Sequence, residues 1–146
     1  MTELEDDYHG AKAALFNRGR VLAYLRDQKP DIPFPGFWDL PGGGREGNED
    51  PTACAQREIE EEFGLSLPRE RFLTCRRYEG IAGGAGSYFL TADLEDAEVE
   101  AISFGDEGQR WALLDVTVFL GDLVVVPALK MRLRDHLYPA EECTPR

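Results

Sequence analysis

Residues 43–65 read GGREGNEDPTACAQREIEEEFGL, and this stretch determines how the rest of the chain is interpreted. Asp50 is a favourable N-cap residue, and Pro51 suits the first helical turn because its missing N–H would have no partner there. Gly64 is typical of the residue that follows a helix. The sequence therefore predicts a helix over Pro51–Phe63, about 20 Å long at 1.5 Å per residue.

Two stripes of different character run along this predicted helix. The apolar stripe recurs every fourth residue and predicts core packing; its members are Ala55, Ile59 and Phe63. Glu58, Glu61 and Glu62 lie at i, i+3 and i+4, so they form an acidic stripe angled away from the apolar one. Like charges at this spacing destabilise a helix unless a hard divalent cation lies among their oxygens. A solvated acidic face is the alternative interpretation.

The spacing of the whole stretch resembles the signature box of the Nudix hydrolases. The match consists of Gly43, five residues, Glu49, seven residues, Arg57-Glu58-Ile59, one residue, Glu61-Glu62, one residue and Gly64-Leu65. No position of the pattern is missing, and chance matches are expected on the order of 10⁻⁸ times per start position. The resemblance implies an α/β fold, namely an α/β/α sandwich with a mixed central sheet.

The resemblance also implies a role for each matching residue. The expected ligands of the catalytic metals, Mg²⁺ or Mn²⁺, are the backbone carbonyl of Gly43 and the side chains of Glu58, Glu61 and Glu62. Glu49 and Arg57 are expected to orient these ligands. On charge alone, Arg57 could instead be a surface partner of Glu61, four residues further on.

A further carboxylate is expected from a loop outside this stretch. Residues 105–111, GDEGQRW, resemble the glutamate-containing loop before a late strand in the MutT-like branch of the family. Glu107 is therefore our candidate for an extra metal ligand or general base. Glu98 and Glu100 are less favoured competitors, and a solvated loop residue is the alternative.

These residues predict metal-assisted hydrolysis of a phosphoanhydride, in which a glutamate takes the proton of the attacking water. The resemblance implies a nucleoside diphosphate linked to another group as substrate. The MutT-like loop favours a nucleoside triphosphate, cleaved to a monophosphate and pyrophosphate. Dinucleoside polyphosphates, ADP-ribose and nucleotide sugars stay open. A sensor that binds nucleotides without hydrolysing them is the alternative of another class, and such a protein would be expected to have lost box glutamates.

Side chains outside the box are candidates for contact with phosphate or base. They are Arg26, Phe34, Trp38 and Tyr88. Trp38 and Tyr88 are also typical of a core, where aromatic residues are more often found.

Composition limits the partners. The 146 residues fit one domain, and the net charge of −12 argues against sustained binding to a nucleic acid polymer or an anionic membrane. A small phosphate-bearing ligand is compatible with this charge, because bound cations would invert the local field. Three cysteines without a CxxC pair indicate a reducing cytoplasm, and we expect Cys54 and Cys75 to be buried. The oligomeric state is expected to be monomer or homodimer.

The remaining elements are predicted from apolar periodicity and turn residues. Strands are expected over residues 11–16, 21–25, 71–78, 87–94 and 110–114, and a closing helix over Pro127–Leu137. Residues 17–20 are expected to form a hairpin turn, and residues 27–36 and 79–86 surface loops, the second of them mobile. The first residues form a short acidic segment, and the tail beyond Pro139 is expected to be disordered.

Overall fold

The computed structural model describes residues 7–80 and 84–139. The acidic N-terminal segment, the tip of the predicted loop over residues 79–86 and the predicted disordered tail lie outside the described residues. None of the helices in the described ranges has the length and apolar character needed to cross a membrane.

The elements follow one another in the order β1 (Tyr8–Asn17), β2 (Arg20–Leu25), β3 (Trp38–Asp39), β4 (Gly42–Gly44), α1 (Pro51–Phe63), a 3₁₀ turn (Arg69–Arg71), β5 (Phe72–Tyr78), β6 (Gly86–Asp93), α2 (Asp96–Glu100), β7 (Arg110–Asp115), α3 (Val116–Leu120) and α4 (Pro127–Leu137). Each predicted strand is present, with bounds shifted by one to three residues. The predicted helices α1 and α4 have the bounds expected from the sequence.

Strand β1 is the centre of a mixed sheet. It pairs with β6 in parallel, and on its other side with both β2 and β4 in antiparallel fashion. The β1–β2 hairpin turns through Arg18 and Gly19, which both have positive φ as a two-residue type I′ turn requires. Strands β3 and β7 pair with β2, and β5 pairs with β6. The short strands β3 and β4 were not predicted.

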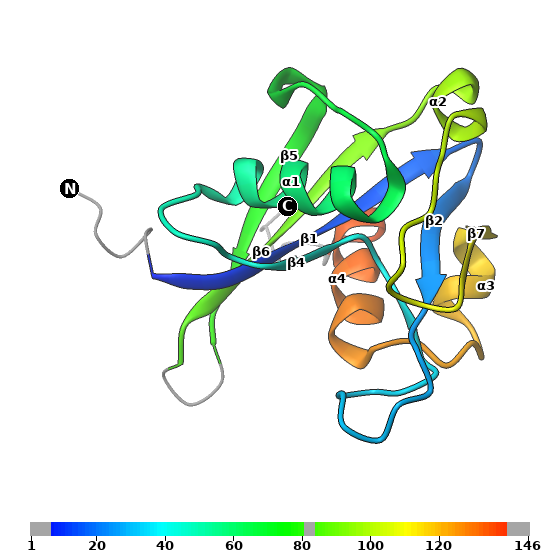
Figure 1. Cartoon of the computed structure of the whole chain (residues 1–146), viewed down its shortest axis with the longest axis horizontal. Coiled ribbons are helices and arrows are strands. Elements are labelled where there is room, and N and C mark those ends of the chain that lie inside the picture. Colours follow the sequence, from blue (N-terminus) through cyan, green and yellow to red (C-terminus); the bar gives the residue numbers. More distant parts are fainter. Residues whose placement is uncertain (1–6, 81–83, 140–146) are drawn as a thin grey trace, which may run out of the picture.

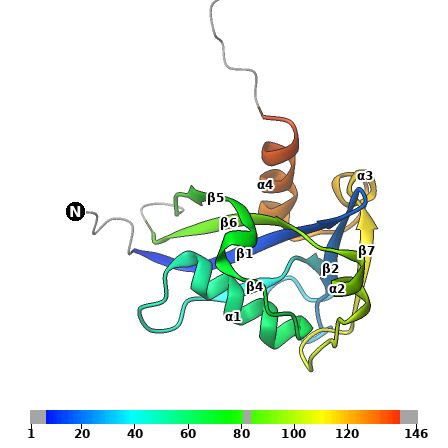
Figure 2. The same cartoon turned by 90° about the horizontal axis from the view of Figure 1, so that it is seen from above.

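Alternation along the strands directs side chains into two hydrophobic clusters, one on each face of the sheet. Leu22 and Tyr24 of β2 belong to the cluster that contains the apolar stripe of α1, whereas Val21 and Ala23 belong to the cluster that contains α4. Figure 2 shows α1 on one face of the sheet and α4 on the other. The molecule is therefore the predicted α/β/α sandwich (Figure 1).

The α1 helix has the ends that its sequence predicts. The Asp50 side chain accepts a hydrogen bond of 2.8 Å from the Ala53 N–H, which caps the first turn. Gly64 adopts the left-handed conformation, with φ of 68°, and donates its N–H to the Glu60 carbonyl. The apolar stripe is fully buried as predicted. These ends fix which residues of α1 face the sheet and which face the loops beside it.

Candidate active site

The Arg57 guanidinium holds the loop before α1 against the helix. Its Nε lies 2.6 Å from Glu49 Oε2 and its Nη2 lies 3.1 Å from Glu49 Oε1, so the two side chains form a two-bond fork. Nη2 also donates to the Gly44 carbonyl at 2.8 Å. These bonds to Arg57 lower the pKa of the Glu49 carboxyl, and the same pairing raises the pKa of Arg57.

The remaining nitrogen of Arg57 contacts the acidic stripe itself. Nη1 lies 3.0 Å from Glu58 Oε2 and 3.3 Å from Glu61 Oε1. Arg57 thus makes the i,i+4 contact with Glu61 and also bridges Glu49 to Glu58. Both geometries considered from the sequence are present together.

Gly43 lies directly against the Glu58 carboxylate. A Cβ atom at Gly43 would lie 2.6 Å from the Glu58 carboxyl carbon, so any side chain there would force the Glu58 carboxylate to move. At Gly44 the nearest atom to such a Cβ would be the His9 carbonyl oxygen, 3.8 Å away. The glycine at position 43 therefore permits a close approach that position 44 does not need.

Glu62 is buried, whereas the sequence predicted an outward-facing stripe. Only 8% of the residue is exposed, and its Oε1 accepts a 3.0 Å hydrogen bond from the Gly42 N–H of β4. Burial raises the pKa of Glu62 to about 8, and the nearby Lys12 cation opposes this rise. Glu61, in contrast, has 58% of its side chain exposed. The stripe thus spans from the protein interior to solvent, because β4 lies against its C-terminal end.

Carboxylates gather around one hollow between α1 and the loop that follows α2. This acidic hollow has a volume of about 300 Å³ and is lined by Glu46, Glu58, Glu61, Glu62, Gly105, Asp106 and Glu107. The structure therefore brings Glu107 to the same hollow as the three box glutamates. No hydrogen bond or ion pair engages the Glu107 side chain within the described part of the chain.

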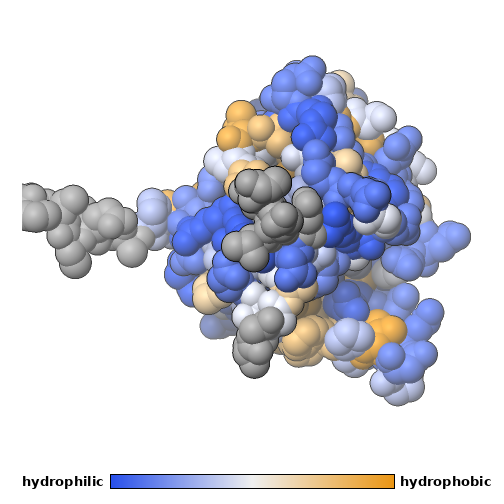
Figure 3. Space-filling model, turned by 90° about the vertical axis from the view of Figure 1, so that its left-hand side faces the viewer, coloured by the Kyte–Doolittle hydropathy of each residue, from blue (hydrophilic) through white to orange (hydrophobic). Residues whose placement is uncertain are grey.

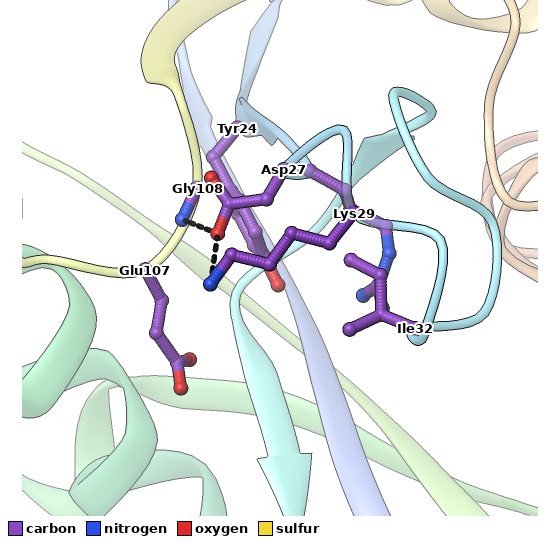
Figure 4. A pocket seen from close by; sticks show the side chains of 7 residues that line it. Tyr24, Asp27, Lys29, Ile32, Glu107 and Gly108 are labelled. Carbon is purple, nitrogen blue, oxygen red and sulfur yellow. Dashed lines mark hydrogen bonds and ion pairs between the residues drawn. The ribbon is translucent and has the colours of Figure 1, made fainter.

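The Glu107 loop is held at both ends. The Gly105 N–H donates to the Glu62 carbonyl at 2.8 Å, and the Gln109 N–H donates to the Leu25 carbonyl at 2.8 Å. Between them, the Gly108 N–H lies 3.3 Å from Asp27 Oδ2. Figure 4 shows this contact, the adjacent Asp27–Lys29 ion pair, and the Glu107 carboxylate pointing away from both. Hydrogen bonds therefore anchor the backbone of this loop on both sides of Glu107.

The lining of the acidic hollow suits a hard divalent cation. Within residues 7–80 and 84–139, no three His, Cys, Asp or Glu side chains are close enough to share an ion as they stand. The reason is that Arg57 holds Glu58 and Glu61 while Gly42 holds Glu62. The side chains around the hollow nonetheless offer only carboxylate oxygens, the donors that Mg²⁺ and Mn²⁺ prefer. The donor chemistry therefore fits the expected metals.

The other candidate acids lie elsewhere. Glu98 forms a fork with Arg71, with distances of 2.8 and 2.7 Å, and its carboxylate also accepts from the Glu95 N–H at the start of α2. Glu100 is exposed on α2. Neither residue lines the acidic hollow. Among the cysteines, Cys54 is buried as predicted. The prediction for Cys75 was wrong, because residues 73–76 of the edge strand β5 are all exposed.

A second hollow lies on the α4 side of the sheet. We call it the basic pocket; its volume is about 380 Å³, and its polar and charged side chains are His9, Lys12, Arg26, Asp39, Ser87 and Arg132. Arg26 and Phe34, both predicted to contact substrate, line it. Trp38 and Tyr88 do not: they are 7% and 9% exposed and pack in the two hydrophobic clusters. Gly43 and Gly44 line the basic pocket as well, so β4 lies between the two hollows.

Asp39 was not predicted as a site residue, yet it organises the wall of this pocket. It is 1% exposed, with Lys12 Nζ 3.1 Å from Oδ1 and Arg26 Nη1 2.8 Å from Oδ2. Lys12 also donates to the Leu40 and Gly42 carbonyls, at 3.0 and 3.1 Å. The Asp39 charge is therefore balanced, and Lys12 fixes the strand that donates to Glu62.

Comparison with known proteins identifies the family. The family model of the NUDIX domain matches residues 9–123, and the chain belongs to this family. Members of the family generally use divalent metal ions.

Individual relatives are similar over part of their length. The RNA pyrophosphohydrolase of Gluconacetobacter diazotrophicus is 31% identical over 112 residues, which are 72% of this chain and 60% of that protein. The 8-oxo-dGTP diphosphatase of Buchnera aphidicola is 44% identical over 42 residues, 29% of this chain and 32% of that protein. The chain thus spans less than two thirds of the length of either relative.

The fold has close counterparts among solved structures. A mutT/nudix family protein from Listeria innocua superposes with a TM-score of 0.70 and 21% sequence identity, covering 90% of this chain and 92% of that chain. This likeness concerns the fold.

Proposed function

We propose that the protein hydrolyses a phosphoanhydride bond of a nucleotide with the help of Mg²⁺ or Mn²⁺. The observation that carries this proposal is the acidic hollow, where Glu58, Glu61 and Glu62 of α1 meet Glu107 from a distant loop. So many carboxylates around one hollow repel one another, and cations shared with a diphosphate would remove that repulsion. Membership of the NUDIX family supports the same chemistry.

Each residue of the hollow has a distinct task in this proposal. Bound metals would neutralise phosphate oxygens and lower the pKa of a water. Glu58, Glu61, Glu62 and the Gly43 carbonyl would hold the cations. Arg57, paired with Glu49, contacts Glu58 and keeps it in place. Glu107 accepts the proton of the attacking water or adds a further ligand, because its carboxylate is uncommitted in the described structure.

The proposed substrate is a nucleoside triphosphate. Water adds to a phosphorus of the α–β anhydride, the bridging bond breaks, and the products are a nucleoside monophosphate and pyrophosphate. The likeness to the 8-oxo-dGTP diphosphatase supports this choice. The basic pocket supports it too, since a pocket of this size beside the acidic hollow can take the base while the phosphates meet the metals.

The second candidate substrate is the 5′-triphosphate end of RNA. The chain is similar to an RNA pyrophosphohydrolase over 72% of its length. The chemistry would be the same, with an RNA strand in place of the free nucleoside. The net charge of −12 favours the free nucleotide, because a polymer brings additional phosphates that the surface would repel.

A substrate screen tests both candidates. The protein is incubated with Mg²⁺ and, separately, nucleoside triphosphates, ADP-ribose, dinucleoside polyphosphates, nucleotide sugars and 5′-triphosphorylated RNA, and the products are identified. Release of monophosphate and pyrophosphate from free triphosphates is the expected result. Turnover of the RNA alone would favour the second candidate. Tight nucleotide binding without turnover of any compound would instead indicate a sensor and contradict the proposal.

A further inference from the structure

Arg132 lines the basic pocket, and no carboxylate of the described residues forms an ion pair with it. Lys12 and Arg26, which line the same pocket, are both paired with the buried Asp39. The Nε of Arg132 is buried without a hydrogen-bond partner in the described ranges. Burial lowers the pKa of its guanidinium, as expected for a cation that no anion compensates.

An aromatic contact holds the Arg132 guanidinium in position, although its Nε has no hydrogen-bond partner in the described ranges. Its central carbon lies 4.5 Å from the centroid of the Tyr78 ring, a cation–π contact. The Tyr78 hydroxyl donates to Asp135 Oδ2 at 3.2 Å, so the ring is anchored in turn. A guanidinium held in this way loses little entropy when it binds a planar acceptor pair.

The pocket around Arg132 suits a base better than a phosphate. Its apolar walls are formed by Pro33, Phe34, Val126, Ala128 and Leu129. Phosphate oxygens gain nothing from such walls, whereas the faces of a purine do. In the proposed function, the phosphates would be bound at the acidic hollow on the other side of β4, where the carboxylates would hold the cations. The N–H groups of the Arg132 guanidinium are therefore placed to donate hydrogen bonds to the edge of a base.

We propose that Arg132 determines base specificity by donating two parallel hydrogen bonds to O6 and N7 of guanine. Guanine presents two adjacent acceptors on this edge, whereas adenine presents N7 beside the N6 amino donor, which an arginine cannot satisfy. The site thus prefers guanine over adenine nucleotides. This inference rests on the proposed nucleotide substrate, but it concerns binding and can be tested without turnover.

The test measures binding of guanosine and adenosine 5′-monophosphates by equilibrium dialysis. The wild-type protein is expected to bind the guanine nucleotide roughly 5- to 150-fold more tightly, the range of one bidentate base contact. Arg132→Met keeps an unbranched side chain but removes both donors, so the preference should fall to within a few-fold. Arg134→Met is the matched control, because Arg134 lies on the same helix, is exposed and is not part of the basic pocket.

A modified ligand locates the contact on the base. 7-Deazaguanosine monophosphate lacks the N7 acceptor, so the wild type should bind it more weakly than guanosine monophosphate. Arg132→Met, which has no donor at this position, should bind the two compounds with the same affinity. A wild type without guanine preference would overturn the inference. So would an Arg132→Leu variant of unchanged melting temperature that weakens guanine nucleotides, adenine nucleotides and pyrophosphate by the same factor, since that pattern indicates a phosphate contact. Guanine-selective binding without hydrolysis would refute only the proposed reaction.

Discussion

At the scale of single residues, one guanidinium contacts four carboxylates in and beside the acidic hollow. Arg57 is within 4 Å of Glu46, Glu49, Glu58 and Glu61, and only 19% of its side chain is exposed. A cation so placed reduces the repulsion among these acids before any metal arrives. The acidic hollow is therefore partly neutralised by the protein itself, and a metal has to compete with Arg57 for Glu58 and Glu61.

Charge removal at Glu61 or Glu62 is the direct test at this scale. Glu61→Gln and Glu62→Gln are each expected to lower kcat/KM on the order of 10²-fold or more, because each removes a carboxylate that would hold the cations. The melting temperature should stay near that of the wild type, since glutamine keeps the shape and, at position 62, an oxygen that can accept from Gly42.

Glu60→Gln is the matched control for both variants. Glu60 is exposed on the same helix, next in sequence to Glu61, and does not line the acidic hollow. Steady-state kinetics at saturating Mg²⁺ and thermal denaturation provide the two measurements. Wild-type turnover in both Glu61→Gln and Glu62→Gln would exclude the acidic hollow as the active site.

At the scale of elements, the site depends on the contact between α1 and the glycine strand β4. The Gly42 N–H binds Glu62, and Gly43 leaves the space that the Glu58 carboxylate fills. Gly10 of β1 also lies close, since a Cβ there would be 2.6 Å from the Gly43 carbonyl oxygen. Gly10 thus lets β1 and β4 approach closely, and Gly43 leaves room for the Glu58 carboxylate beside β4.

Gly43→Ala should separate activity from stability. The added methyl group would displace the Glu58 carboxylate, a flexible side-chain end, so we expect a large loss of activity with a change of only a few degrees in melting temperature. Gly44→Ala is the control, because its methyl group meets no atom closer than 3.8 Å. Equal activity of the two variants, measured with the best substrate of the screen, would contradict the role given to Gly43.

Local signals explain which elements the sequence could predict. Asp50, Pro51 and Gly64 specify both ends of α1 by short-range hydrogen bonds and backbone preference, so its bounds were correct. Strand β4 consists only of glycines and carries no apolar alternation, so its pairing with β1 follows only from the fold. The five-residue helices α2 and α3 are too short for a periodic pattern and were missed for that reason.

At the scale of the whole molecule, the sheet separates two hollows of opposite character. Carboxylates line the hollow beside α1, and cations predominate in the pocket beside α4. The surface elsewhere is largely hydrophilic on the face drawn in Figure 3, with apolar residues in small separate patches. The two parts of a nucleotide match these two hollows. Its phosphates bind divalent cations, which carboxylates can hold, and its base binds in a pocket with apolar walls.

Metal binding should therefore be visible in global stability. We expect Mg²⁺ to raise the melting temperature of the wild type, because a ligand bound only by the folded state stabilises it by about 2.7 kcal/mol at 100 times its Kd. The double variant Glu61→Gln/Glu62→Gln should lose this shift, and Glu60→Gln should keep it. A wild type whose melting temperature is the same with and without Mg²⁺ would argue for a solvated acidic face.

Long-range pairing explains what the sequence could not predict about the site. The acidic stripe was visible because its members are neighbours along one helix. Burial of Glu62 was not, because it depends on β4. The Lys12–Asp39–Arg26 network joins β1, β3 and the residue that follows β2, whose register no local pattern reveals. Arg132 was likewise missed, since its helix was predicted from the stripe of Leu129, Leu133 and Leu137, of which the first two are buried.

The parallel pairing of β1 with β6 also has a consequence for how the chain matures during synthesis. Ala11 lies beside Tyr88 and Leu15 beside Ala92, so the central ladder cannot close until the ribosome has released residues up to about Asp93. A nascent chain that ends earlier already contains residues 43–65, but it lacks the complete β1–β6 part of the sheet against which α1 packs. Contacts between such distant segments slow folding. The acidic hollow must therefore form late, after the glutamates of α1 have long been translated.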